Sequence, residues 1–527
     1  MKRKVLLCGT HPMQFNGYSK VVFELSNELA KYEDIDLHVF GFQNFYAEKE
    51  HSEERKLPDN VTIFDPFAEE EKGGKGFGDK IIKDYVLDLS PDIVILYNDV
   101  IVVSSLIKQL VTIKDRKFKI VPYIDLVYQN EKKQLLDYIH AESDSIIAFT
   151  DYWKKELIRQ DYGKKIYILN HAFNKDNYFP IPKSIARKYF DIDPKDYIIL
   201  NLNRNQPRKR WDICIQAYIK FLSKHKGDRI KLLVMTNVIG CWDLIELMKF
   251  EGKKYGFDLK DLKSYFTFVQ NPQKISDAEI NVMYNVADIG WNTCDGEGFG
   301  LCNFEQAGVG VPQVIPRVGG FRDFFTDENS QLVEPVVGIY GDSTKDACGG
   351  MQEICSVDAH VDALEKYYSS RDLIKAHGKR ARADILKYTW KHQGSVLRDL
   401  ILEQTDDLYS EESSSDLLDS INKMLDANEE EQQAAQQNYE SGSGELNIDI
   451  DALINEKIKE KTAKESITKQ AEIESRNTQE KQSINQKSPE LRPNLTEELD
   501  NLSPNDLIRM QQKIQHILNK KNNSMIE

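Results

Sequence analysis

Residues 295–312 read Asp-Gly-Glu-Gly-Phe-Gly-Leu-Cys-Asn-Phe-Glu-Gln-Ala-Gly-Val-Gly-Val-Pro, and they are the most informative part of the chain. It contains two glutamates, Glu297 and Glu305, that stand eight positions apart. Upstream, residues 287–292 predict a short apolar strand, and downstream Phe304 begins a predicted helix. The two glutamates therefore flank a predicted strand–loop–helix junction.

The loop between the glutamates suits a phosphate group. A helix that begins behind a glycine-bearing loop presents unpaired backbone N–H groups and the positive end of its dipole. Glycine also lets a ligand approach the backbone closely, so we interpret Gly298, Phe299, Gly300 and Leu301 as donor-binding residues. A carboxylate on each side can accept hydrogen bonds from paired sugar hydroxyls. The stretch predicts a nucleotide-sugar site.

Three blocks of the chain resemble retaining glycosyltransferases of family four, which have the GT-B fold. The first is the stretch above, which resembles the family's Glu-x7-Glu motif. The second is residues 203–212, Asn-Arg-Asn-Gln-Pro-Arg-Lys-Arg-Trp-Asp, which resemble its Arg-x4-Lys segment. The third is residues 285–288, Asn-Val-Ala-Asp, which resemble the helix-to-strand passage before the glutamate motif. The similarity is diffuse over about residues 5–400, but the three blocks occur in the family's order.

The resemblance implies a role for each charged residue of these blocks. Glu297 would contact the donor sugar, and Glu305 would hold the ribose hydroxyls. Arg204 and Lys209 would clamp the donor diphosphate and neutralise it as it leaves, since Arg can bind bidentately and Lys acts as a compact charge. An acid at a helix start and a solvated basic turn are the respective structural alternatives. The family often has glycine where this chain has Arg210.

Two residues of the first half complete the predicted site. Gly17 matches a family glycine near the diphosphate or acceptor, although Asn16 stands where the family usually has a second glycine. A plain turn is the alternative for Gly17. Asp125 follows a predicted strand, and related transferases place a polar residue there against the donor sugar or the acceptor. We interpret Asp125 as a catalytic candidate, with a loop or cap aspartate as the alternative.

Strand and helix patterns alternate along most of the chain, which favours parallel sheets covered on both faces. The predicted fold class is α/β, GT-B, with two Rossmann-like, doubly wound domains facing across a cleft. Residues 1–180 predict an acceptor domain, 181–195 a proline-bearing linker, and 196–384 a nucleotide-sugar-binding domain. A helix around 385–404 is expected to pack back onto the first domain.

The individual elements are predicted from apolar runs and helical spacing. A helix is predicted from Lys20 to Tyr32, and residues 46–80 are interpreted as a surface excursion. The predicted strands lie at residues 5–9, 37–40, 93–96, 119–123, 145–149, 197–202, 231–235, 266–269, 288–291 and 313–316.

The C-terminal part of the chain has a different composition. Residues 405–500 are dominated by Glu, Gln, Asn, Ser and Lys, and we predict a largely disordered, acidic and polar tail. Residues 501–522 predict a short amphipathic helix, which is either marginal or a site for docking a partner or for self-association.

Composition excludes several classes of protein. The 527 residues carry a net charge of -15, which argues against a nucleic-acid-binding protein. The seven cysteines form no Cys-x2-Cys pair, so they predict reduced thiols in a cytoplasmic protein. No cluster has metal-ligand spacing, and no apolar run reaches the roughly 20 residues of a membrane span. Peripheral attachment to a membrane stays open.

The sequence therefore predicts a metal-independent, retaining hexosyltransferase with a nucleotide diphosphate sugar as donor and no cofactor. The acceptor would be a hydroxyl group, on a glycan, a glycolipid or a protein-linked sugar. Retention is implied by the resemblance alone. The alternatives are a non-catalytic nucleotide-sugar-binding or scaffold protein, and another GT-B enzyme such as an epimerase or a phosphorylase. The sequence does not choose between UDP, GDP and ADP sugars.

Overall fold

The computed structural model describes residues 2–44, 55–70, 76–269, 275–341 and 349–409. All of them belong to one compact unit that spans Met1–Tyr409. The amphipathic helix predicted at 501–522 lies outside the described residues, as does the predicted tail apart from its first five positions.

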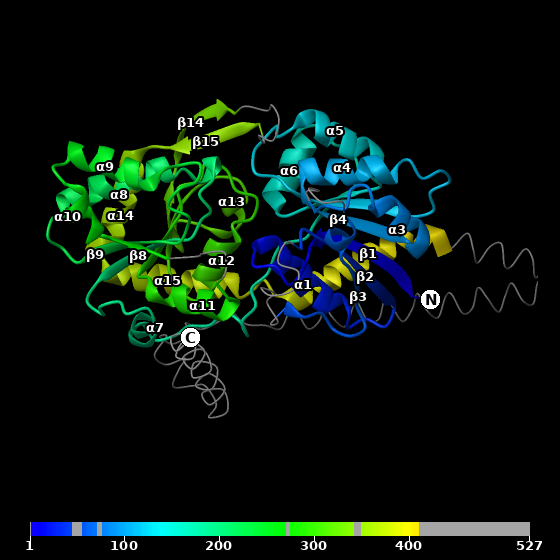
Figure 1. Cartoon of the computed structure of the whole chain (residues 1–527), viewed down its shortest axis with the longest axis horizontal. Coiled ribbons are helices and arrows are strands. Elements are labelled where there is room, and N and C mark those ends of the chain that lie inside the picture. The colour runs from blue at the N-terminus through cyan, green and yellow to red at the C-terminus, as the bar shows by residue number, and fades with distance from the viewer. Residues whose placement is uncertain (1, 45–54, 71–75, 270–274, 342–348, 410–527) are drawn as a thin grey trace, which may run out of the picture. The chain divides into compact units, whose positions relative to one another are not determined.

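The first sheet has seven strands in the order β3-β2-β1-β4-β5-β6-β7. Figure 1 labels its strands β1, β2, β3 and β4. Every neighbouring pair is parallel. The strand order reverses between β1 and β4, which makes a topological switch point at the carboxyl ends of these two strands. The strands are β1 (Arg3–Thr10), β2 (Ile35–Phe42), β3 (Thr62–Phe64), β4 (Ile93–Asp99), β5 (Lys119–Asp125), β6 (Ile146–Ala148) and β7 (Ile166–Ile168).

The second sheet has six parallel strands in the order β10-β9-β8-β11-β12-β13. Its neighbouring strands β8 and β9 are labelled in Figure 1. Its switch point lies between β8 and β11. A two-stranded antiparallel hairpin follows, formed by β14 (Pro335–Tyr340) and β15 (Met351–Cys355). The sheet strands are β8 (Tyr197–Asn201), β9 (Ile230–Val234), β10 (Phe266–Phe268), β11 (Ile289–Trp291), β12 (Gln313–Pro316) and β13 (Ser330–Val333).

Helices connect the parallel strands, as parallel sheets require. The first sheet is accompanied by α1 (Gly17–Leu29), α2 (Pro66–Glu69), α3 (Ile82–Leu89), α4 (Val100–Leu110), α5 (Lys133–Glu142) and α6 (Asp151–Arg159). The second is accompanied by α7 (Lys183–Tyr189), α8 (Trp211–Lys224), α9 (Leu244–Lys254), α10 (Leu259–Lys263), α11 (Asp277–Val286), α12 (Leu301–Gly308), α13 (Phe321–Phe324), α14 (Val357–Ser369) and α15 (Arg371–Ile385).

The predicted fold class is confirmed, because each of the ten predicted strands overlaps an observed strand of a parallel sheet. The sequence reading missed β3, β7 and β13 of the parallel sheets and both strands of the hairpin, β14 and β15. Strand β3 lies inside residues 46–80, so the interpretation of that segment as a surface excursion is wrong at β3. Its three residues pair only with β2, and a short edge strand needs no apolar run that a sequence pattern could reveal.

Helix α1 begins three residues before the predicted Lys20, and the reason is its cap. The Asn16 side chain accepts a hydrogen bond from the Ser19 N–H at 2.9 Å, and the Ser19 hydroxyl accepts from the Asn16 N–H at 3.3 Å. This reciprocal pair is a capping box, which satisfies two N–H groups at the helix start. Asn16, which departs from the family's usual glycine, therefore fixes the start of α1.

The segment predicted as a linker, residues 181–195, is more ordered than an extended connection. It contains α7, whose buried Arg187 donates to the Val286 carbonyl at 3.1 Å and to Asp288 Oδ2 at 2.8 Å. Prolines at 180, 182 and 194 marked this stretch as a linker, and in the structure Pro182 is the N-cap of α7. The segment therefore packs against the second half.

The last described helix, residues 390–409, lies against the first half of the chain. Arg398 Nε donates to Asp34 Oδ1 at 3.0 Å, and Gln404 Nε2 donates to the Tyr167 hydroxyl at 2.9 Å. The helix runs to residue 409, so the prediction that the disordered tail begins at 405 is wrong for its first five residues.

The described residues contain no helix that is long and apolar enough to cross a membrane. Six cysteines fall within the described ranges, and all six are free thiols.

Candidate functional site

The candidate site lies at the switch point of the second sheet, where two loops run side by side. One loop follows β8 and contains the 3-10 turn η2 (Pro207–Lys209); the other follows β11. The Asp295 N–H donates to the Arg208 carbonyl at 3.0 Å, and the Thr293 hydroxyl donates to the Lys209 carbonyl at 3.1 Å. These bonds bring the basic segment and the glutamate motif together at the edge where ligands bind in open α/β sheets.

Glu297 is buried, with 6% of its surface exposed, and it is held by two cations. Arg208 Nη1 lies 3.2 Å from Glu297 Oε2, and Lys209 Nζ forms an ion pair with the same oxygen. Burial opposes the ionised carboxylate, but the charges of Arg208 and Lys209 outweigh it and lower the pKa of Glu297 to about 2. Glu297 is therefore ionised at neutral pH.

The structure does not bring Arg204 to this cluster. Arg204 is exposed, and its backbone carbonyl accepts hydrogen bonds from the Gln206 N–H at 2.9 Å and from the Trp211 indole N–H at 3.3 Å. Arg208 is the arginine that reaches Glu297, and it also donates to the Gly296 carbonyl at 3.3 Å. The basic segment thus places a different arginine beside Lys209 from the one that the resemblance implies.

Arg210 has a left-handed backbone, with φ of 50°, which glycine adopts more readily than other residues. The Arg210 side chain donates to Asp212 Oδ1 at 2.9 Å and Oδ2 at 2.6 Å, and it lies 3.6 Å from Asp295 Oδ2. Arg210 is thereby turned away from Glu297 towards two other carboxylates.

Asp125 lies at the end of β5, directly against Gly298. A Cβ atom built on Gly298 would lie 1.8 Å from Asp125 Oδ1, so only glycine allows this approach. Asp125 Oδ2 accepts a hydrogen bond from the Tyr18 hydroxyl at 2.5 Å. Burial raises the pKa of Asp125, and the charge of Arg208 partly offsets this. The first half of the chain thus contributes a carboxyl group next to the glutamate motif.

The loop that precedes α12 presents backbone donors. Gly300 caps the helix with φ of 83°, and a Cβ atom there would lie 2.0 Å from the Phe321 ring. Within the described ranges, the N–H groups of Gly298, Phe299 and Gly300 donate to no protein acceptor, although all three residues are buried. Buried N–H groups are rarely left without a partner in native proteins. Their position at a helix start suits an anion.

In this loop Phe299 presents its backbone N–H as a donor, whereas its ring packs into an aromatic cluster. The ring is 4.4 Å from that of His171, 4.6 Å from Phe324 and 4.9 Å from Phe304, measured between centroids. This aromatic cluster fixes the loop between the two glutamates. Burial lowers the pKa of His171 to about 3, so this histidine is a neutral member of the cluster.

Glu305 lies on α12 with 2% of its surface exposed, and it is paired with a residue of the first half. Lys20 Nζ, on α1, donates to Glu305 Oε1 at 2.8 Å and to Oε2 at 2.9 Å. The Tyr284 hydroxyl donates to Oε2 at 2.9 Å. Burial raises the pKa of Glu305, and the charge of Lys20 acts in the opposite direction.

A second buried carboxylate lies beside this pair. Asp277 Oδ1 is 3.6 Å from Lys20 Nζ and accepts from the Tyr178 hydroxyl at 2.8 Å. Arg55 binds Asp277 with two parallel hydrogen bonds of 2.8 and 2.7 Å. Burial opposes ionisation of Asp277, but Lys20 and Arg55 lower its pKa below the ordinary range. Two buried cations and two buried carboxylates therefore form one balanced network.

Gly17 and Leu301 lie in contact between α1 and α12. A Cβ atom on Gly17 would have Leu301 Cδ2 as its nearest neighbour, at 3.7 Å, which is ordinary van der Waals contact. Gly17 also has no left-handed backbone, so packing alone does not require glycine at this position. The predicted donor contact of Gly17 remains a prediction.

The sequence reading missed Lys20, Arg55, Tyr18 and Asp277, because their partners lie far away along the chain. Lys20 is separated from Glu305 by 285 positions, and Arg55 from Asp277 by 222. No local spacing marks such pairs. Arg208 was visible in the basic segment, and its place beside Lys209 was the signal that could have identified it.

A buried carboxyl group supports the loop that faces Gly296. Glu131 Oε2 accepts hydrogen bonds from the Val127 N–H at 2.7 Å and the Tyr128 N–H at 3.2 Å. A Cβ atom on Gly296 would lie 2.3 Å from the Tyr128 ring, so this loop and the glutamate motif are in close contact. Burial raises the pKa of Glu131 from 4.5 to about 8.

The raised pKa of Glu131 predicts a pH effect on stability. The folded protein retains a proton on Glu131 that the unfolded chain loses near pH 4.5, so the free energy of unfolding falls as the pH rises from about 4.5 to about 8. The Glu131→Gln variant retains an oxygen acceptor but cannot ionise. We expect the free energy of unfolding of this variant to fall less than that of the wild type over this pH interval. Denaturant unfolding at several pH values measures the difference. Glu142→Gln on α5 is the control, and a variant with the wild-type pH profile would contradict this prediction.

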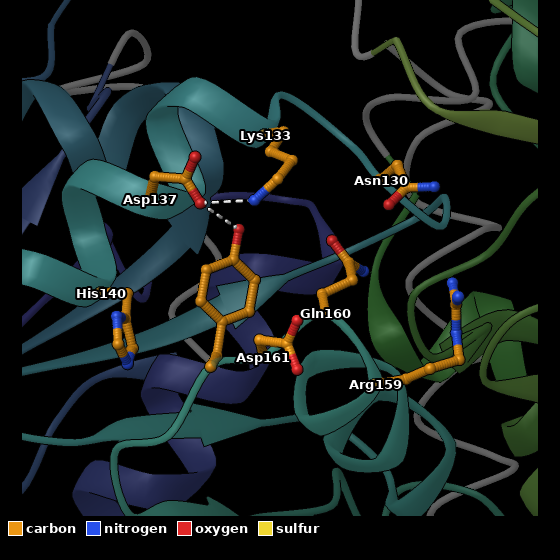
Figure 2. Close-up of a pocket in the computed structure, with 8 residues that line it drawn as sticks. Asn130, Lys133, Asp137, His140, Arg159, Gln160 and Asp161 are labelled. Carbon is orange, nitrogen blue, oxygen red and sulfur yellow. Dashed lines mark hydrogen bonds and ion pairs between the residues drawn. The ribbon is translucent and has the colours of Figure 1, made fainter.

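A pocket of about 430 Å³ lies elsewhere, along α5 and the end of α6. Asp137 accepts hydrogen bonds from Lys133 Nζ at 2.7 Å and from the Tyr162 hydroxyl at 2.9 Å. Figure 2 shows Lys133 pointing towards Asp137, with a dashed line between them. None of the predicted site residues lines this pocket. The candidate site is instead closed by its own ion pairs, so a bound diphosphate would have to replace contacts at Glu297 and Glu305. Among the described residues, no group of three or more His, Cys, Asp or Glu side chains is arranged to hold a metal ion.

Comparison with known proteins agrees with this fold. No family model matches the chain. The D-inositol 3-phosphate glycosyltransferase of Rhodococcus opacus is 24% identical over 234 residues, which cover 42% of this chain and 48% of that protein. The enzyme of the same name from Gordonia bronchialis is 24% identical over 263 residues, which cover 48% and 50%. The chain thus spans about half the length of the curated relatives it matches.

Solved structures define the class of fold. Sucrose-phosphate synthase from Thermosynechococcus elongatus superposes with a TM-score of 0.59 at 15% identity, over 76% of this chain and 99% of that one. Anabaena HepE in complex with UDP and glucose superposes with a TM-score of 0.56 at 12% identity, over 76% and 100%. The chain has the GT-B fold. Its resemblance to retaining glycosyltransferases of family four is confirmed by the curated relatives together with this fold.

Proposed function

We propose that this protein is a retaining glycosyltransferase that moves a hexose from a nucleotide diphosphate sugar to a hydroxyl acceptor. One observation carries the proposal. At the switch point of the second sheet, two cations, the partly buried Arg208 and the buried Lys209, meet a buried carboxylate next to three unbonded N–H groups at the start of α12. This set of groups suits a diphosphate attached to a sugar.

The cations and the N–H groups would stabilise the departing diphosphate. Negative charge develops on the leaving oxygen as the bond to the sugar breaks, and preorganised donors stabilise that charge without reorganising. In this scheme Arg208 and Lys209 exchange Glu297 for phosphate oxygens. The N–H groups of residues 298–300 would bind the same anion from the start of α12.

The carboxylates would act on the sugars. Glu297, released from its cations, would accept hydrogen bonds from the hexose, and Glu305 would accept from the two ribose hydroxyls. Asp125, held by Tyr18 against Gly298, would face the transferred sugar or the acceptor from the first half. Following the family resemblance, the acceptor attacks from the face that the diphosphate leaves, and a phosphate oxygen takes the acceptor's proton.

The relatives suggest which substrates to test first. Anabaena HepE was solved with UDP-glucose, with UDP, and with UDP and glucose. UDP-hexoses are therefore the first donors to test, followed by GDP- and ADP-hexoses. The curated relatives are named for D-inositol 3-phosphate, which makes an inositol phosphate the first acceptor to test. The deciding experiment measures nucleoside diphosphate released with and without acceptor. Tight donor binding without release would support the non-catalytic alternative instead.

Removing the carboxylate of Glu305 is expected to weaken donor binding. The Glu305→Ala variant cannot accept from the ribose hydroxyls, and hydrogen bonds to charged groups contribute about 1.5–3 kcal/mol each, so the Kd for the donor should rise at least about tenfold. Calorimetric titration with the nucleotide sugar that proves active among the tested donors measures this change in Kd. Glu328→Ala, which removes an exposed glutamate paired with Arg380, is the control. An unchanged Kd in the Glu305→Ala variant would remove the ribose contact from the proposal.

A further inference from the structure

We propose that Lys20 is a displaceable counter-ion of Glu305, which competes with the donor ribose for that carboxylate. The inference rests on the proposed function, in which Glu305 accepts hydrogen bonds from the ribose. It adds a residue of the first half that regulates how tightly the second half binds the nucleotide.

The contacts at Glu305 leave too little room for a pair of hydroxyl groups. Lys20 donates to both carboxylate oxygens, at 2.8 and 2.9 Å, and Tyr284 donates to Oε2 at 2.9 Å. A carboxylate has about four lone-pair sites, and these contacts use three of them. The two ribose hydroxyls need two sites. At least one of these three contacts must therefore be given up when the ribose is bound, and Lys20 holds two of them.

Lys20 has other partners that would stay with it after this exchange. Its Nζ donates to the Tyr178 hydroxyl at 2.5 Å and lies 3.6 Å from Asp277 Oδ1. Asp277 is already ionised and bound by Arg55, so a displaced Lys20 remains beside a negative charge. Leaving a buried ammonium group without any partner would be costly. The neighbouring carboxylate avoids that cost, which makes the exchange feasible.

The pair also connects two elements that carry the site. Lys20 lies on α1 of the first half, and Glu305 lies on α12 directly behind the loop with the unbonded N–H groups. When the ribose takes the place of Lys20 at Glu305, binding of the nucleotide would break the ion pair between α1 and α12. Part of the binding free energy of the nucleotide is then used to break this pair, and the measured affinity is lower than the contacts alone would give.

The test compares nucleotides with and without the ribose hydroxyls. UDP, GDP and ADP and their 2′,3′-dideoxy forms are titrated by calorimetry at pH 8.5 into wild-type protein and into the Lys20→Met variant. Methionine retains the apolar stem of lysine and removes the charge. We expect the Kd of the preferred ribonucleotide to fall about fivefold or more in the variant. The dideoxy form should bind wild type and variant equally, because it does not use Glu305.

Two further variants keep the result interpretable. Lys31→Met removes an exposed lysine paired with Glu28 just after α1, and it should leave every Kd unchanged. Lys20→Gln retains a hydrogen-bond donor for Glu305 without the charge, and it should shift the Kd in the same direction if Lys20→Met does not fold. Ribonucleotide affinity that is unchanged or weaker in the Lys20 variants overturns the inference alone. If none of the three nucleotides binds any form of the protein, the proposed function fails as well.

Discussion

Replacing Lys209 with methionine is expected to reduce turnover by roughly a hundredfold to a thousandfold, while the protein stays folded. Lys209 is the ammonium group nearest to Glu297, in the turn after β8, and the proposed reaction develops negative charge at this point. Removing one preorganised electrostatic donor commonly has an effect of that size on kcat. Release of nucleoside diphosphate in the presence of acceptor measures it. Folding is favoured because Arg208 still compensates Glu297.

The control for this variant is a lysine at the far end of the next helix. Lys224 lies at the end of α8, about half exposed and 3.5 Å from Glu365, and Lys224→Met should have wild-type turnover. A parallel comparison separates the two candidate arginines. If Arg208 binds the diphosphate, Arg208→Met should resemble Lys209→Met and Arg204→Met should not. The opposite pattern would show that Arg204, exposed in this structure, moves to the donor as the family resemblance implies.

Removing the Asp288 carboxylate is expected to destabilise the fold by about 3–5 kcal/mol, because it leaves a buried arginine without its counter-charge. Asp288 precedes β11 and accepts from Lys183 Nζ, from Arg187 Nη2 and from the Ile198 N–H, each at 2.8 Å. The Asp288 carboxylate thereby connects α7 and β8 to the start of β11. Denaturant unfolding of the Asp288→Ala variant at pH 7 measures the loss.

The same variant has an expected pH dependence. Burial opposes ionisation of Asp288, but the charges of Lys183 and Arg187 lower its pKa below the ordinary value of 3.8. Its stabilising contribution is therefore complete above about pH 4 and is lost as the pH falls through the folded-state pKa. The difference between wild type and variant should shrink in acid. Asp358→Ala, at an exposed pair with Lys220, should change stability by less than about 1 kcal/mol, and a similar loss in both variants would contradict the argument.

The sequence predicted the sheet strands well because burial on both faces leaves a strong signal. Strands such as β1 and β4 are continuous apolar runs, and each run is short and bounded by turn residues. The short strands β3 and β7, with three residues each, lie at the edges of the first sheet and carry no comparable run. The start of α1 was misplaced because the capping role of Asn16 depends on the Ser19 side chain three residues later.

The candidate site was predicted in part, for a related reason. Its contiguous pieces, the basic turn and the glutamate motif, are visible as local patterns, and the structure brings Lys209 and Glu297 together. The choice between Arg204 and Arg208 depends on the backbone of η2, which a spacing rule does not specify. The partners of Glu305 and Asp277 come from the first half of the chain, and one sequence contains no measure of such distant proximity.

The helix at 390–409 has a consequence for how the molecule can be divided. The chain leaves the first half after β7, builds the entire second sheet, and then returns through this helix to Asp34 and Tyr167. In effect, the second lobe is an insertion within the first lobe. A fragment that stops near residue 180 would expose the surface that this helix covers. An autonomous first lobe would need residues 2–180 fused by a short artificial connection to residues 390–409.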